Sequence, residues 1–337
     1  MDGIGPGVLQ YPEMSSVLLA VLLLCPPAWA GRQPTTPEQR EAAAEFVRRD
    51  PDFGRRFSRA WEKTINELES TRAHAAFLFG KEKIPVVYVD PGLTLEESMI
   101  AMFEGPTGRF LVNRTDLALS ALRLSQTGVP SKEVPEVLAW KMLPALAHEL
   151  RHAIVREELL KAFGSPCGEV FLDDELLAYA DTARVAREAV GLHPEYWEES
   201  LLLPDLDANS GILIDAWERG PKIMLETVRQ TVGTSRASEL SPAECLKAGE
   251  DWRKESEIEL RSLTGGKLPP KGVSDVLRKA RKTGELPRED KLRLELDLVD
   301  HCERLFRDPR RFEKLRGFYR SKWAAVEELW RAEQRSQ

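Results

Sequence analysis

The segment from about Val134 to Phe163 constrains the fold of this chain more than any other. Its residues follow a helical pattern throughout, and it contains Pro144, which should kink the helix or mark a junction. In its second half stands the run Leu-Ala-His-Glu-Leu-Arg-His-Ala, residues 146–153. The small and apolar neighbours of the two histidines are typical of a buried helix. We therefore expect a long internal helix that carries two histidines four residues apart.

This spacing has a direct chemical meaning. Residues four apart lie on one face of an α-helix, so His148 and His152 can point at the same metal ion. Glu149 would project beside them and take the proton of a metal-bound water, whose pKa zinc lowers as a Lewis acid. With 5 histidines in 337 residues, the pattern arises by chance on the order of 1% of the time. The sequence therefore predicts a catalytic site for one zinc ion.

A catalytic zinc site also needs a third protein ligand and an open coordination position. A third histidine ten residues after the first is excluded because Glu158 stands there, and no cysteine lies between residue 30 and the motif. The remaining candidates are acids on the next predicted helix, at about residues 173–190. With Asp173 as the helix cap, Glu175 would lie in the first turn. We expect Glu175 to be the third ligand, with Asp174 as the alternative.

The two motifs together resemble those of the gluzincin-type zinc metallopeptidases, which carry H-E-x-x-H on one helix and a ligand glutamate on the next. The resemblance covers roughly residues 84–190, and the run Glu-Leu-Leu-Ala-Tyr from Glu175 looks like the second motif of several small bacterial members. It implies that His148, His152 and Glu175 hold zinc and that Glu149 is the general base. It also implies that the protein hydrolyses peptide bonds through a metal-bound water.

One position departs from that pattern. Thermolysin-like members have an aspartate four residues after the ligand glutamate, where it orients a histidine, and this chain has Tyr179. Either Asp174 or Asp181 can take that part here. Stabilising an oxyanion needs a donor opposite the zinc, and the nearby candidates are Tyr179, His193 and Tyr196.

Two short runs predict strands within this mainly helical chain. Ile84–Val89 is rich in β-branched residues, and Arg109–Asn113 follows a Gly-Pro-Thr-Gly turn. Other helical patterns start at Thr36, where a hydroxyl precedes a proline. The predicted fold is therefore α+β and mostly α: a zincin-like small mixed sheet with an active-site helix, plus a helical C-terminal region. In such folds an edge strand pairs with an extended substrate, and Arg109–Asn113 is the strand expected to do so.

The N-terminal residues predict export. An apolar run from Val17 to Cys25 is followed by a small-x-small sequence that ends at Ala30, as in a cleaved signal peptide. The residues before Met14 look like an upstream mis-start, and a lipid anchor at Cys25 is the alternative. The predicted division of the chain is a signal peptide at 1–30, an N-terminal helical region at 31–83, a zincin-like catalytic core at 84–192 and a helical C-terminal region at 193–337.

Composition limits the partners. The chain has 48 basic and 55 acidic residues, a net charge of −7, and this balance argues against a nucleic-acid binder. The N-terminal apolar run is too short for a transmembrane helix, so we expect no membrane span after signal cleavage, and a peptide or protein as substrate. The three remaining cysteines, Cys167, Cys245 and Cys302, allow at most one disulfide.

Two other functions fit the same residues. The first is a non-catalytic binding protein on a zincin scaffold, in which the metal is structural. The second is metal-assisted hydrolysis of another amide, such as a cell-wall peptide. Convergence of His148, His152 and Glu175 beside a groove at Glu149 would favour an enzyme over a binding protein.

Overall fold

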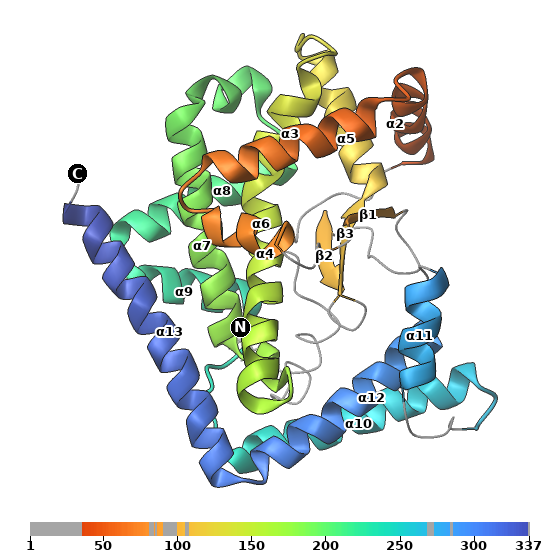
Figure 1. The fold of residues 1–337 in the computed structure, drawn as a ribbon, viewed down its shortest axis with the longest axis vertical. Helices are drawn as coiled ribbons and strands as arrows, with labels where there is room; N and C mark the ends of the chain where they lie inside the picture. The colour runs from red at the N-terminus through yellow and green to blue at the C-terminus, as the bar shows by residue number, and fades with distance from the viewer. Residues whose placement is uncertain are drawn as a thin grey trace, which may run out of the picture.

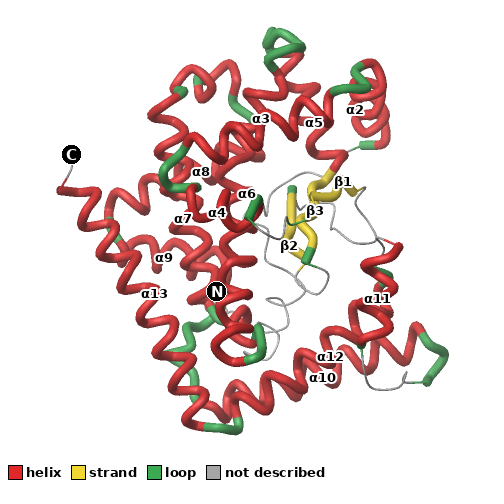
Figure 2. The backbone as a smooth tube through the Cα atoms, in the orientation of Figure 1, coloured by secondary structure: helices red, strands yellow, loops and turns green. Residues whose placement is uncertain are grey.

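The structure is a computed structural model of the 337-residue chain, and it describes residues 36–80, 84, 86–89, 100–104, 108–267, 273–283 and 286–335. Within these ranges the protein is mostly helical and contains a three-stranded mixed sheet (Figure 1 and Figure 2). This agrees with the expected α+β, mostly α class. The predicted signal peptide at 1–30, with the alternative anchor at Cys25, lies outside the described residues.

The sheet corrects one prediction. Strand β3 (Arg109–Asn113) has the predicted bounds, but it lies in the middle of the sheet, parallel to β1 (Val86–Val89) and antiparallel to β2 (Ala101–Glu104). The prediction that residues 109–113 form an edge strand is therefore wrong. β2 occupies the edge that faces helix α6 (Val134–Phe163), because the apolar residues 100–103 fold back onto β3 as an antiparallel partner (Figure 2).

The N-terminal helices pack against the sheet and the long helix α6. The start of α2 agrees with the sequence, since the Thr36 hydroxyl accepts a hydrogen bond from the Gln39 amide at 3.2 Å. Phe57, Trp61 and Ile65 lie four residues apart on α3 and are buried in the core that contains β3 and the first half of α6. The helices of this part are α2 (Pro37–Arg49), α3 (Phe53–Glu67), α4 (Arg72–Leu78) and α5 (Arg114–Gln126).

Helices α6 and α7 (Leu172–Leu192) run side by side and link two hydrophobic cores. Helix α6 has the predicted bounds and continues through Pro144. Up to Leu150 its apolar residues belong to the core with the sheet, and from Val155 they belong to a second core with the C-terminal helices. The two cores therefore meet next to the H-E-x-x-H motif.

The C-terminal helices pack on the second half of α6. Helices α10 and α12 lie side by side as an arm, with α11 at the end farthest from α13 (Figure 1). None of the helices within the described ranges has the length and apolar character needed to cross a bilayer. The elements are η1 (Cys167–Val170), η2 (Pro194–Trp197), η3 (Glu199–Leu201), α8 (Pro204–Arg219), α9 (Pro221–Val232), α10 (Pro242–Leu263), α11 (Ser274–Thr283), α12 (Arg288–Phe306) and α13 (Pro309–Arg335).

A disulfide joins η1 to α12. It links Cys167 to Cys302 across 135 residues of sequence, whereas Cys245 is a buried free thiol. This agrees with the expectation that the three cysteines form at most one disulfide. The bridge holds the short connection between α6 and α7 against the C-terminal helices.

Candidate metal centre

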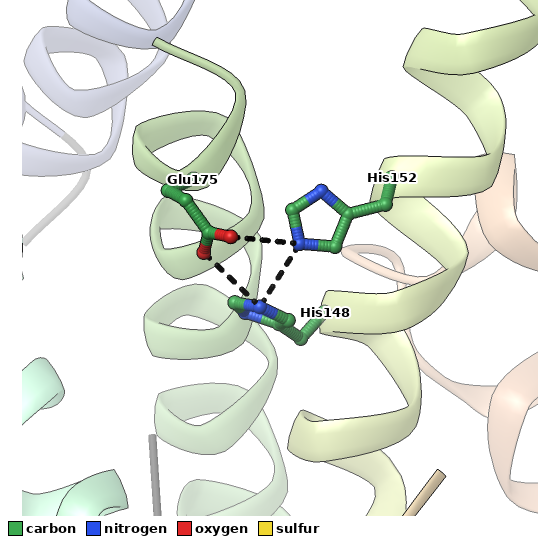
Figure 3. Close-up of side chains that lie close together, drawn as sticks. All are labelled: His148, His152 and Glu175. Atoms are coloured by element: carbon green, nitrogen blue, oxygen red, sulfur yellow. Dashed lines mark hydrogen bonds and ion pairs between the residues drawn. The ribbon is translucent and has the colours of Figure 1, made fainter. Parts of the chain in front are cut away.

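Two helices bring the predicted ligands together. His148 and His152 lie one turn apart on α6, and Glu175 lies in the first turn of α7 (Figure 3). The connection between the helices reverses the chain, and it starts at Gly164, whose φ of 67° ends α6 in a left-handed conformation. The start of α7 is therefore directed back toward the middle of α6, where the histidines are.

The donor atoms have the spacing of a metal site. The two histidine Nε2 atoms are 3.1 Å apart. Glu175 Oε2 is 3.5 Å from Nε2 of His148, and Oε1 is 3.7 Å from Nε2 of His152. Ligands 2.0–2.2 Å from one tetrahedral ion lie about 3.3 to 3.6 Å from each other. The structure thus assembles His148, His152 and Glu175 into a largely buried group that could hold a metal ion (Figure 3).

The outer nitrogens of both histidines have partners that leave Nε2 free for a metal. Asp174 Oδ2 lies 2.6 Å from Nδ1 of His152 and accepts a hydrogen bond from it. Thr182 Oγ1 donates to the Ala178 carbonyl oxygen at 2.9 Å, so it accepts from Nδ1 of His148, 3.3 Å away. These partners place a proton on Nδ1 of both rings, so that with a metal ion bound each ring presents its Nε2 lone pair to the ion, as a metal ligand must.

These contacts show which of the neighbouring aspartates orients a histidine and whether Asp174 is itself a ligand. Asp174 contacts the outer side of a ligand and is not part of the ligand group, so it is the orienting aspartate. Asp181 instead pairs with the buried His74 at 3.1 Å. Asp173 is not the helix cap, because Phe171 holds that position. The Asp173 carboxylate accepts hydrogen bonds from the Arg236 guanidinium and the Ala237 amide, which tie α7 to the segment before α10.

The electrostatics of the site favour a cation. Burial raises the pKa of Glu149 and of Asp174, although the adjacent histidines act against it. Burial lowers the pKa of His152, but Asp174 and Glu175 outweigh burial and raise it to about 10. Three carboxylates thus surround two imidazoles, and a positive charge between them is stabilised whether it is a proton or a metal ion.

Glu149 faces the edge strand. The Phe103 amide on β2 donates to Glu149 Oε2 at 3.4 Å. The carbonyls of Ile100 and Glu104 accept hydrogen bonds from the β3 side of the sheet, so the alternation of a strand directs the backbone groups of Ala101 and Phe103 to the opposite edge, with which no described strand pairs. The general-base candidate therefore lies beside the outward-facing backbone groups of β2 and accepts a hydrogen bond from one of them, the Phe103 amide.

Sequence reasoning missed β2 and Thr182. Two apolar runs separated by the four residues Gly-Pro-Thr-Gly at 105–108 are a hairpin signal, and that signal was sufficient to predict β2. Thr182 is seven residues after Glu175, two turns along the same face of α7. This spacing was the sequence signal that could have predicted Thr182 near the ligand histidines.

The three residues predicted as oxyanion donors lie in different places. The Tyr179 ring packs edge-on against His148, with 4.6 Å between ring centroids. His193 stacks on Tyr196 and contacts Trp140. Since His193 is 18 residues after Glu175 in the sequence and caps the same helix, it lies about 27 Å along the axis from the ligand group. Only Tyr179 of the three predicted donors is at the metal centre.

Comparisons of the chain with known protein families, with curated proteins and with solved structures found no match.

Proposed function

We propose that this protein is a zinc-dependent metallopeptidase of the gluzincin type. The observation that carries the proposal is the convergence of His148, His152 and Glu175, with Glu149 next to them at the edge of the sheet. Two imidazole nitrogens and one carboxylate are a ligand set that suits zinc. Among the described residues no fourth His, Cys, Asp or Glu joins the group, and three protein ligands are typical of catalytic rather than structural zinc.

The chain's own residues have distinct roles in the proposed reaction. A zinc ion bound at this site would polarise the scissile carbonyl and lower the pKa of the attacking water. Glu149 accepts the proton of that water and passes it to the leaving amine. Burial raises the pKa of Glu149, which makes its carboxyl better suited to both accept and return a proton. Asp174 and Thr182 keep the two histidines in the required tautomer.

The outer edge of β2, with which no described strand pairs, suggests how a substrate is held. An extended peptide can add to the sheet as a further strand by pairing with the outward backbone groups of Ala101 and Phe103. This mode uses main-chain hydrogen bonds and therefore accepts many sequences. Strand β2 thus takes the substrate-pairing role that the sequence had predicted for Arg109–Asn113. Pairing with β2 brings the substrate backbone beside Glu149. We propose peptides or proteins as substrates, encountered outside the cytoplasm if residues 1–30 act as a signal.

The test compares the wild type with Glu149→Gln, using bound zinc and hydrolysis of a generic unfolded protein such as casein. The proposal predicts that the variant keeps its zinc and loses activity by about 10²- to 10⁴-fold. The matched control is Glu157→Gln, an exposed glutamate on the same helix that pairs only with Lys161 among the described side chains. A wild type that binds zinc but cleaves neither proteins nor peptides would contradict the enzyme and favour the binding-protein alternative.

A further inference from the structure

Two buried polar atoms, one at η1 and one at the start of α7, have no hydrogen-bond partner among the described residues. One is the hydroxyl of Tyr319, a residue of α13 that is 1% exposed, and the other is Oδ1 of Asp174, which is 2% exposed. Asp174 uses its other oxygen to hold Nδ1 of His152. Because leaving a buried polar atom without a partner costs about 1 to 3 kcal/mol, each of these atoms points to a missing interaction.

The hydroxyl of Tyr319 lies against the connection between the two ligand-bearing helices. A Cβ atom added to Gly168 in η1 would meet this hydroxyl oxygen at 2.5 Å. The absence of a side chain at Gly168 therefore lets the phenol reach inward past η1. The ring itself is held by aromatic contacts with Phe171 and Phe318, with centroid separations of 6.4 and 5.2 Å.

The charges of four carboxylates act on that hydroxyl. Burial, together with the charges of Asp174 and of three further acids, raises the pKa of Tyr319 well above its ordinary value, so the phenol keeps its proton and is a donor. The three further acids already have cationic partners: Asp173 with Arg236, Glu169 with Arg156 and Glu158 with Lys322. Oδ1 of Asp174 is the buried carboxylate oxygen in this group that has neither a hydrogen bond nor an ion pair to a described residue.

We propose that Tyr319 is a positioning residue for the metal centre: its hydroxyl donates, through one buried water molecule, to Oδ1 of Asp174 and so fixes the carboxylate that orients His152. A buried water needs two to four polar partners, and these two atoms supply two of them. The C-terminal helix would thereby set the direction of a ligand on α6. The inference rests on the proposed metal site, in which His152 binds the ion through Nε2.

The experiment compares the full-length wild type with Tyr319→Phe, which keeps the ring and removes the hydroxyl. Zn²⁺ affinity is measured by competition with a chromophoric chelator. Changing an outer partner of a ligand commonly costs 10- to 100-fold in metal affinity, and for this more distant partner we expect a loss of about 10-fold. The control is Tyr88→Phe, whose hydroxyl bonds to Ser58 on α3, and it should leave the affinity unchanged. Equal affinities for the wild type and Tyr319→Phe would overturn the inference.

Two further measurements separate positioning from a loss of packing. In an Asp174→Asn background, Tyr319→Phe should change the zinc affinity by less than about twofold, because the two residues act through one path. In the metal-free protein with labelled histidines, the Nδ1 proton of His152 should exchange with solvent faster in Tyr319→Phe than in the wild type. A wild type without zinc affinity would refute the proposed function, and an unchanged exchange rate would refute the role of Tyr319 separately.

Discussion

The imidazole of His152 is held from two directions. Asp174 fixes Nδ1 at 2.6 Å, and Nε2 faces His148 and Glu175 across 3.1 and 3.7 Å. A ring fixed in this way cannot turn its other nitrogen toward the site without breaking a short, charge-assisted hydrogen bond. At the scale of single residues, the ligand geometry therefore exists before a metal binds, and the cost of ordering the site is already met by the fold.

Glu169, on η1, predicts a pH-dependent contribution to stability. Burial, opposed by the ion pair with Arg156, raises its pKa from 4.5 to about 7. The folded state thus holds a proton that the unfolded state has lost, so the contribution of Glu169 is largest below pH 4.5 and disappears as the pH rises to 7. This range corresponds to about 3 kcal/mol at most.

Urea unfolding of chelator-treated protein at pH 5 and pH 8 measures this effect. Relative to Glu169→Gln, which keeps a hydrogen-bond acceptor for Arg156 and does not titrate, the wild type should lose stability between the two pH values. A difference between the two proteins that is the same at both pH values would contradict the assignment.

At the scale of elements, the turn between α6 and α7 determines whether the site forms. It contains two glycines with different roles: Gly164 adopts φ 67° at the end of α6, and Gly168 makes room for Tyr319 and Leu159. A Cβ at Gly168 would lie 2.8 Å from the Leu159 side chain as well as 2.5 Å from the tyrosine hydroxyl. Neither neighbour is an exposed, flexible group that can move aside.

We predict that Gly168→Ala lowers the free energy of unfolding by about 1 to 3 kcal/mol, the usual cost of overpacking. The matched control is Gly191→Ala near the end of α7, where an added Cβ meets nothing within 4 Å. That substitution should stabilise the helix by about 0.5 to 1 kcal/mol. Chemical denaturation of both variants checks the prediction, and it is refuted if the two substitutions have the same effect.

The sequence was most informative where spacing alone determines geometry. Two histidines four apart and an acid in the first turn of the next helix predicted the ligand group, because helical periodicity fixes which residues of one helix share a face. It was least informative where long-range packing decides. The order of strands in a sheet depends on tertiary pairing, so β3 was assigned to the edge that β2 occupies. Nothing local to Asp173 indicated that Arg236, 63 residues later, would bind its carboxylate.

In the molecule as a whole, the candidate metal centre lies where two hydrophobic cores meet. The first core joins the sheet to the start of α6, and the second joins the end of α6 to the C-terminal helices. The end of α13 is tied back to α7 and α8, because Glu333 accepts hydrogen bonds from Arg184 at 2.9 Å and from Trp217 at 3.0 Å. The C-terminal helices therefore pack directly against the two helices that carry the ligand group.

The disulfide makes this packing testable. Closing a loop of 135 residues restricts the unfolded chain enough to contribute up to about 5 kcal/mol. We predict that Cys302→Ala lowers the urea midpoint of the wild type substantially. Cys245→Ala, which removes the buried free thiol and leaves the bridge intact, should lower the midpoint less. Equal midpoints for the wild type and Cys302→Ala under oxidising conditions would contradict the bridge.

The proposed site requires His148, His152 and Glu175 to hold one metal ion together. The most direct measurement is the zinc content of the purified full-length protein after removal of metal, incubation with excess zinc and dialysis. We predict one zinc per chain for the wild type and close to none for His152→Ala, while His301→Ala, which alters a half-exposed histidine on α12, keeps one. A wild type without zinc, or a His152→Ala variant that still holds one zinc per chain, would show that these three residues do not form the proposed site.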